Sequence, residues 1–304
     1  MQKKLLTSLG SLVALVALGF VGQQLYKNWH KVGDYQFTIE SISTLLLGAI
    51  IYSCACLLLS SAWYQILTTL SSQKLSAKVL RCIYARSQIA KYIPGNVLQI
   101  AGRHLMIRRL GVAHKPLALA SLVEIMGLLS ASCSITLVGS TLFGLGENYI
   151  QTQQLYYGLV AVAILLLLLP IFRLISLKFI PSSRNILSNP SLLWAFIRAY
   201  LEYLLFFIIA GAILVGLVYQ HYGVLSIYNI AAIMATFSVS WLAGFITPGA
   251  PSGIGIRETI LVISLDKILL GGNGVLIAIL FRIMTIGGDV LFFSIVGKTQ
   301  QDAQ

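Results

Sequence analysis

The sequence predicts an all-α polytopic membrane protein with about eight transmembrane helices. Of its 304 residues, 58% are hydrophobic and only 10% are charged, whereas about a quarter of the residues of an average soluble domain are charged. The apolar residues also gather in long segments, and a transmembrane helix needs about 20 such residues. We therefore expect a single integral membrane domain over residues 1–304, without an additional soluble domain.

The first apolar segment extends from Leu5 to Val21, directly after Lys3 and Lys4. Such a segment fits either a signal peptide or a short first span. We expect a retained span, because Ala17-Leu18-Gly19 is only a fair match to a cleavage site. Hydropathy predicts seven further spans, over residues 41–67, 116–144, 155–172, 192–219, 227–246, 256–270 and 275–296.

Lysine and arginine fall mainly on one side of these spans. With a cytoplasmic N-terminus, the inner side collects Lys3, Lys4, the basic cluster from Lys74 to Lys115, and Lys298. The positive-inside rule then places both termini in the cytoplasm, and we expect a bacterial inner membrane. The net charge of +12 is accounted for by topology and by attraction to anionic lipids, so nucleic acid is not an expected partner.

Two Pro-Gly motifs have the same spacing to an arginine. Pro94-Gly95 is followed eight residues after the glycine by Arg103, and Pro248-Gly249 is followed at the same offset by Arg257. Proline and glycine interrupt helices, and irregular backbone at membrane depth is tolerated where it lines a cavity. We therefore predict two re-entrant or broken-helix loops and an internal repeat of residues 93–103 and 247–257.

Three more glycines are expected to shape these loops: Gly102, Gly253 and Gly255. Four predicted spans separate the motifs, which would put both loops on the cytoplasmic side. The alternative is that each loop is a plain turn whose arginine extends to the lipid headgroups.

Several ionisable residues are predicted to lie at membrane depth. Glu124 is about 12 Å into its span and Glu202 about 15 Å into its own, at a rise of 1.5 Å per residue. Arg282 and Asp289 are seven residues apart and share a helix face. Charges at this depth are costly unless they are paired or hydrated. We predict that a substrate-binding cavity is lined by Arg103, Glu124, Glu202, Arg257, Glu258, Arg282 and Asp289, the alternative being salt bridges that only fix helix packing.

No metal or other cofactor is expected. The cysteines Cys54, Cys56, Cys82 and Cys133 lie in apolar segments or at their edges and fit small buried hydrophobic residues. The four histidines are scattered, without a neighbour at metal-ligand spacing.

Three motifs together resemble the flippase-like family named after the transmembrane region of lysylphosphatidylglycerol synthase. They are Ala90-Lys91-Tyr92-Ile93-Pro94-Gly95 with Gly102-Arg103 downstream, Glu124 in the following span, and Thr247-Pro248-Gly249-Ala250-Pro251-Ser252-Gly253-Ile254-Gly255-Ile256-Arg257-Glu258. The resemblance covers residues 41–296. One departure is Gly-Ala-Pro-Ser-Gly in the last motif, where we expect more glycine in relatives.

The resemblance implies a helical membrane unit that translocates or handles lipids, including aminoacylated phospholipids and lipid-linked precursors of envelope glycans. The two-part synthases carry an additional aminoacyl transferase domain, so that activity is not transferred to this chain. Residue by residue, the resemblance marks Pro94, Gly95, Arg103, Glu124, Pro248, Gly249, Gly253, Gly255, Arg257 and Glu258.

The function expected from these features is translocation of a phospholipid or a polyprenyl-phosphate-linked lipid for envelope biogenesis. Arginine pairs with phosphate through two parallel hydrogen bonds, and the chain has no Gly-x-x-x-x-Gly-Lys-Ser/Thr loop for ATP. Expected partners are the anionic or lipid-linked substrate, membrane lipids, envelope glycan or lipid biosynthesis enzymes, and a second copy of the chain. The alternatives are an intramembrane transferase, which usually needs an Asp-x-Asp or Asp-Asp pair that is missing here, and a non-transporting scaffold of an envelope-assembly complex.

Overall fold

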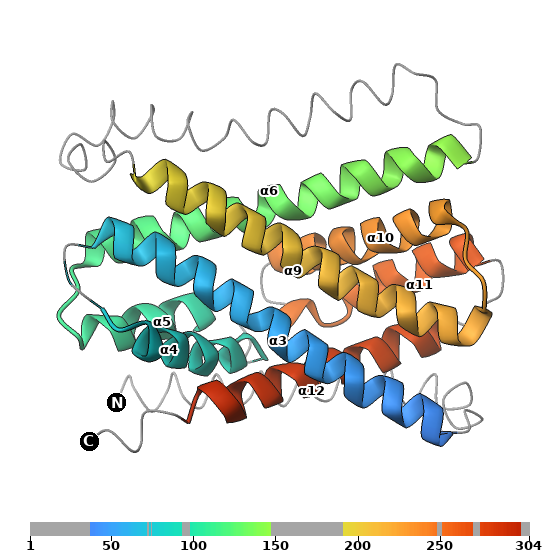
Figure 1. The fold of residues 1–304 in the computed structure, drawn as a ribbon, viewed down its shortest axis with the longest axis horizontal. Helices are drawn as coiled ribbons and strands as arrows, with labels where there is room; N and C mark the ends of the chain where they lie inside the picture. The colour runs from blue at the N-terminus through green and yellow to red at the C-terminus, as the bar shows by residue number, and fades with distance from the viewer. Residues whose placement is uncertain are drawn as a thin grey trace.

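The computed structural model describes residues 37–71, 73, 75–92, 98–146, 191–247, 251–269 and 274–298. These residues form helices and short connections, with no strand among them (Figure 1). The predicted all-α class is therefore confirmed for the described residues. Several predictions lie outside them, namely the spans over 5–21 and 155–172 and the loop residues Pro94, Gly95, Pro248 and Gly249.

Five helices are long and apolar enough to cross a membrane, as expected for a membrane-embedded protein. They begin and end within three residues of the predicted spans, and they are α3 (Ile39–Leu70), α6 (His114–Gly146), α9 (Ser191–Tyr222), α10 (Ile227–Ile246) and α12 (Gly274–Val296). Two of them begin with a serine or threonine cap. The Thr38 Oγ1 accepts from the Ser41 N–H at 3.2 Å, and the Ser226 Oγ accepts from the Asn229 N–H at 3.1 Å.

A short span is predicted over residues 256–270, and the helix found there is not among those long enough to cross a membrane. The helix there, α11 (Ile256–Leu269), has 14 residues, which is about 21 Å at 1.5 Å per residue. A membrane core is about 30 Å thick. The helix instead packs back along α10, after a connection that contains the 3-10 turn η3 (Pro251–Gly253). α10 and α11 thus form a helical hairpin.

The basic segment before the first Pro-Gly motif forms a second helical hairpin. It consists of α4 (Ala77–Ile89), the 3-10 turn η1 (Ala90–Tyr92) and α5 (Leu98–Arg108). α4 packs against both α5 and α12. The apolar side of α4, which includes the buried Leu80 and Ile83, faces the helix bundle.

The helices fall into two units of the same build, each with a long helix, a hairpin and a second long helix. The first unit is α3–α4–α5–α6, and the second is α9–α10–α11–α12. The main contacts between the long helices and hairpins have counterparts when the units are exchanged: α6 packs on α9 and α10, and α12 packs on α3 and α4. Corresponding helices run in opposite directions along the bundle (Figure 1).

The two hairpins enter the bundle from opposite ends, and their tips meet near its centre. In Figure 1 the α4–α5 hairpin comes from the left and the α10–α11 hairpin from the right. η1 at one tip contacts η3 at the other. The expectation that both loops lie on the same side counted the segment 227–246 as a complete crossing, whereas α10 and α11 form a hairpin that enters the bundle from the end opposite to the α4–α5 hairpin.

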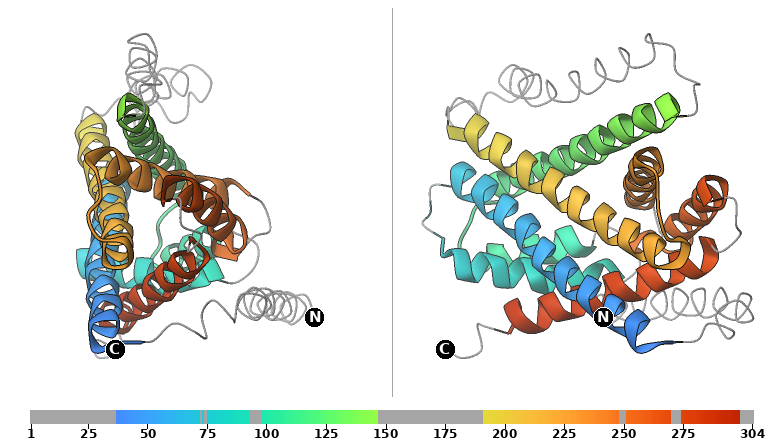
Figure 2. Two further views of the ribbon diagram at one scale, coloured as in Figure 1. Left: turned by 90° about the vertical axis from the view of Figure 1, so that its right-hand side faces the viewer. Right: turned by 45° about the vertical axis from the view of Figure 1, so that its right-hand side comes forward.

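The remaining helices surround this meeting point, as the view along the bundle in Figure 2 shows. Long helices α3 and α9 pack on each other, with Tyr52 edge-on to Phe206 at 5.8 Å between ring centroids. α12 approaches α3 closely at Gly288, where an added Cβ would lie 2.8 Å from the Ala49 carbonyl oxygen. Small residues permit such close contact between membrane helices.

Candidate functional site

Polar groups from the hairpins and from the long helices meet in the centre of the bundle. Three ion pairs join different elements: Lys91 with Asp289, Arg103 with Glu124, and Arg282 with Glu258. They connect η1 to α12, α5 to α6, and α12 to α11 respectively. Each pair therefore holds part of a hairpin against a long helix.

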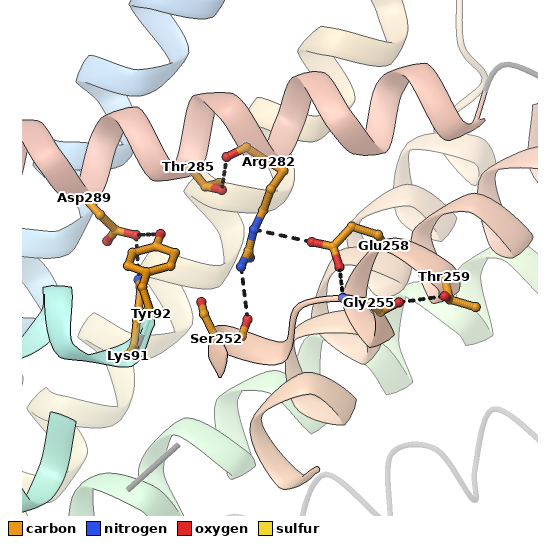
Figure 3. Close-up of polar contacts among 9 residues, drawn as sticks. All are labelled: Lys91, Tyr92, Ser252, Gly255, Glu258, Thr259, Arg282, Thr285 and Asp289. Atoms are coloured by element: carbon orange, nitrogen blue, oxygen red, sulfur yellow. Dashed lines mark hydrogen bonds and ion pairs between the residues drawn. The ribbon is translucent and has the colours of Figure 1, made fainter. Parts of the chain in front are cut away.

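Asp289 on α12 binds the tip of the α4–α5 hairpin (Figure 3). Its Oδ2 lies 2.6 Å from the Lys91 Nζ and accepts from the Tyr92 hydroxyl at 2.5 Å. The Cys56 thiol on α3 lies 3.8 Å from the other carboxylate oxygen. Because the side chain of Asp289 is only 1% exposed, separating the tip from α12 would leave a buried carboxylate without its cation.

Arg103 and Glu124 form a bidentate pair in the interior. The Arg103 Nη2 lies 2.8 Å from the Glu124 Oε2, and the Nη1 donates to Oε1 at 2.9 Å. The Tyr84 hydroxyl donates to the same Oε1 at 3.1 Å. The guanidinium is also sandwiched between aromatic rings, with its Cζ 4.7 Å from the Trp63 centroid and 4.4 Å from that of Tyr84. Arg103 is thus neutralised and held on both faces.

Glu258 has two roles at the start of α11. Its Oε2 accepts from the Gly255 N–H at 2.6 Å, as in a capping box, and its Oε1 lies 3.3 Å from the Arg282 Nε (Figure 3). The Arg282 Nη2 also donates to the Ser252 carbonyl oxygen at 3.4 Å. Arg282 therefore holds the tip of the α10–α11 hairpin on α12.

Arg257 differs from the other three cations of the site. Within the described residues it has no carboxylate at ion-pair distance, whereas Lys91, Arg103 and Arg282 each have one. Its Cζ lies 5.5 Å from the Trp241 ring centroid. A cation at this distance is attracted to an indole face but remains free to bind an anion.

Two glycines make room for the Arg257 side chain. A Cβ on Gly244 would lie 2.6 Å from the Arg257 Cγ, and one on Gly253 would lie 2.8 Å from the Arg257 Nε. The turn that contains Gly253 is left-handed, with φ of 51° at Ser252, 70° at Gly253 and 88° at Gly255. Glycine adopts these angles without strain, so the positive φ of Gly253 and Gly255 is compatible with the predicted loop-shaping role.

Arg257 lies between two small cavities. The larger cavity has a volume of about 50 Å³, and its charged lining residues are Lys91, Arg103, Glu124 and Arg257. The smaller cavity has a volume of about 20 Å³, and its charged lining residues are Lys91, Arg257, Glu258, Arg282 and Asp289. Tyr52 and Ser252 line both. The larger cavity has room for a few water molecules, so a lipid headgroup would enter only if the hairpin tips separated.

Six of the seven predicted binding residues therefore lie around these cavities, in agreement with the shared face predicted for Arg282 and Asp289. Glu202 does not line them. Its Oε1 accepts from the Gln65 Nε2 at 2.6 Å and from the Ser61 hydroxyl at 3.2 Å, so it joins α9 to α3. Gly102 lies inside α5, where an added Cβ would meet no atom within 4 Å, and the structure gives it no part in a bend.

Lys91 was not among the predicted site residues, because it was counted with the basic cluster that sets topology. Its position three residues before Pro94 was the available signal, since it belongs to the same motif. Trp241 and Tyr84 were also missed, and nothing in the local sequence marks them as ring partners of an arginine.

Among the described residues no group of three histidine, cysteine, aspartate or glutamate side chains could hold a metal ion. No family model, curated protein or solved structure matches this chain. The resemblance to the lysylphosphatidylglycerol synthase membrane region thus stays a prediction, and the site itself must carry the functional argument.

Proposed function

We propose that this chain is a lipid translocase of a bacterial inner membrane, which binds the phosphate of a lipid headgroup between its two hairpins. The observation that carries the proposal is Arg257, a partly buried arginine that borders both cavities without a carboxylate partner among the described residues. A guanidinium can form two parallel hydrogen bonds with a phosphate. The N-terminus of α11, where Arg257 lies, adds partial positive charge to the same place.

The proposed topology has six complete spans and two re-entrant hairpins. Residues 5–21 and 155–172 would supply spans in addition to α3, α6, α9 and α12. The α4–α5 hairpin would enter from the cytoplasm and the α10–α11 hairpin from the outer side. This arrangement keeps both termini and the basic segment from Lys78 to Lys115 on the cytoplasmic side, in agreement with the positive-inside rule.

Two opposed hairpins suit a carrier that opens to one side at a time. Transporters built from inverted units bind their substrates near the middle of the membrane, at broken helices. Here the ion pair of Lys91 with Asp289 closes one hairpin against α12, and the contacts of Arg282 with Glu258 and Ser252 close the other. Opening one tip while the other stays closed would expose Arg257 to one leaflet.

The experiment that tests this proposal uses the purified full chain in liposomes that contain a fluorescent phosphatidylglycerol. Loss of fluorescence after addition of an impermeant reductant reports the fraction of label in the outer leaflet, and its slow phase reports translocation. We expect Arg257→Gln to abolish the slow phase and Arg257→Lys to retain part of it, because lysine keeps the charge but not the planar fork.

The matched control is Arg198→Gln, which removes an exposed arginine of α9. It should translocate lipid like the wild type. Wild-type activity in a folded Arg257→Gln variant would contradict the proposal and favour the scaffold alternative. Product formation from a lipid-linked donor by the purified protein would favour the transferase alternative.

A further inference from the structure

The charges around the two cavities do not balance. Four cations face them, Lys91, Arg103, Arg257 and Arg282, against the three carboxylates Glu124, Glu258 and Asp289, which leaves one net positive charge. The three ion pairs account for every one of these groups except Arg257. The connections that adjoin the tips, residues 93–97 and 248–250, have sequences without an ionisable residue.

We infer that the site selects a lipid headgroup with a single negative charge, namely a phosphodiester lipid with an uncharged headgroup substituent. The inference rests on the proposed function and specifies its substrate class. An uncompensated charge in a low-dielectric interior is costly. One phosphodiester would neutralise Arg257 and leave the three ion pairs intact.

Other lipid classes would leave the site with net charge. A diphosphate-linked lipid would add at least one more negative charge than Arg257 can neutralise. A zwitterionic headgroup would bring an ammonium group to a site whose carboxylates are already paired, and a lysyl-esterified headgroup would bring two. The described residues thus disfavour an aminoacylated phospholipid, although the family resemblance would allow one.

The inference predicts that selectivity follows the net charge of the site. Arg257→Gln lowers that charge to zero. Glu258→Gln raises it by one, because it releases Arg282 from its ion pair while an amide oxygen can still accept the hydrogen bond from the Gly255 N–H. Glu258 is chosen rather than Asp289 because its side chain is 24% exposed and that of Asp289 only 1%, so water can reach the substituted amide.

The experiment measures competition in liposomes that contain fluorescent phosphatidylglycerol and the full chain. The unlabelled competitors are phosphatidylglycerol, phosphatidylethanolamine, lysyl-phosphatidylglycerol and a polyprenyl diphosphate. For the wild type, we expect phosphatidylglycerol to compete best. For Glu258→Gln the order should shift towards the polyprenyl diphosphate. Native mass spectrometry of the purified proteins measures which of these lipids each variant retains. We expect Arg257→Gln to lose the preference for phosphatidylglycerol over phosphatidylethanolamine.

The possible failures of the two proposals are distinct. Two results would overturn the charge inference and leave translocation standing. One is that the polyprenyl diphosphate or lysyl-phosphatidylglycerol competes more strongly than phosphatidylglycerol in the wild type. The other is that the ranking of the competitors is the same in Glu258→Gln as in the wild type. Absence of translocation for every lipid would reject the proposed function. In that case the lipid that stays bound to the protein in native mass spectrometry would test the charge inference by itself. Preferential retention of phosphatidylglycerol would support the inference, and preferential retention of any other lipid would overturn it.

Discussion

The two arginines at matching positions of the Pro-Gly motifs have different surroundings. Arg103 is paired with Glu124 and stacked between two rings, whereas Arg257 has only the Trp241 ring and the two cavities beside it. Their matching positions in the motifs predicted the same role in phosphate binding for both. The contacts indicate a structural role for Arg103 and support the proposed binding role of Arg257.

Arg103 should therefore matter first for stability. Arg103→Gln leaves the buried Glu124 without its cation, and breaking a buried pair from one side costs about 3–5 kcal/mol. The double variant Arg103→Gln with Glu124→Gln should recover much of this loss, because no uncompensated charge remains. Thermal unfolding of the detergent-solubilised proteins measures both, and Arg257→Gln serves as the comparison that unfolds near the wild-type temperature. Equal destabilisation in the single and double Arg103 variants would contradict the assignment.

The glycines beside Arg257 give a second test at this scale. Gly253→Ala combines an unfavourable positive φ with a Cβ that would lie 2.6 Å from the Gly244 Cα, so we expect loss of lipid translocation and a lower unfolding temperature. Gly216→Ala is the control, because an added Cβ on this glycine of α9 meets nothing within 4 Å. It should translocate normally and unfold at the same or a slightly higher temperature, since alanine favours helix by up to about 1 kcal/mol. A normal Gly253→Ala variant would show that the turn is an ordinary connector.

At the scale of elements, α12 holds both hairpin tips. Asp289 binds η1, and Arg282, seven residues earlier, binds the turn at Ser252 and the start of α11. The two contacts are about 10 Å apart along the helix at 1.5 Å per residue. This separation allows one tip to detach while the other remains bound.

Hydrogen exchange can measure this independence. Asp289→Asn weakens only the contact with Lys91 and Tyr92, so backbone exchange should increase in residues 84–92 and stay unchanged in residues 251–258. Arg282→Gln should produce the opposite pattern. Both follow from the rule that local opening depends on the contacts of the segment that opens. An increase in both segments in either variant would mean that the tips open together.

The sequence predicted the long helices better than the hairpins. Uninterrupted apolar segments identify α3, α6, α9, α10 and α12 because hydropathy and length are both local properties. The sequence predicted a short span over residues 256–270, in agreement with the 14 residues of α11, but it did not show that α11 packs back along α10. α4 carries too many basic residues to resemble a membrane element, and its position depends on packing against α12.

The candidate site was predicted in part for the same reason. Arginine, glutamate and aspartate within apolar segments stand out from their neighbours, which identified six residues that line the cavities. Which acid pairs with which base depends on the opposed entry of the hairpins. Glu202 was included because it is equally deep, yet its partners Ser61 and Gln65 come from the crossing of α3 and α9.

At the scale of the whole molecule, the two hairpins enter the bundle from opposite ends, so the side from which each one opens depends on the membrane topology. The α4–α5 hairpin opens towards the end of the bundle where α3 and α12 end, and the α10–α11 hairpin opens towards the end where α3 and α12 begin (Figure 1). If these ends are the cytoplasmic and outer sides, each hairpin controls access from one side. The membrane topology of the hairpins is therefore a test of the mechanism.

Cysteine labelling of intact cells with an impermeant reagent supplies that test, with the wild type and its native cysteines as background. Exposed positions at the open ends should differ: Lys78→Cys and Arg109→Cys should be protected, and Val224→Cys and Lys267→Cys should react. Ser252→Cys distinguishes a re-entrant α10–α11 hairpin from a topology in which α10 and α11 each cross the membrane completely. Ser252 is 4% exposed at the tip, so the introduced thiol should be protected in intact cells and also in inverted membrane vesicles. Two complete crossings would instead place it in a cytoplasmic loop, and labelling in inverted vesicles would rule out the re-entrant hairpin and with it the proposed access from the outer side.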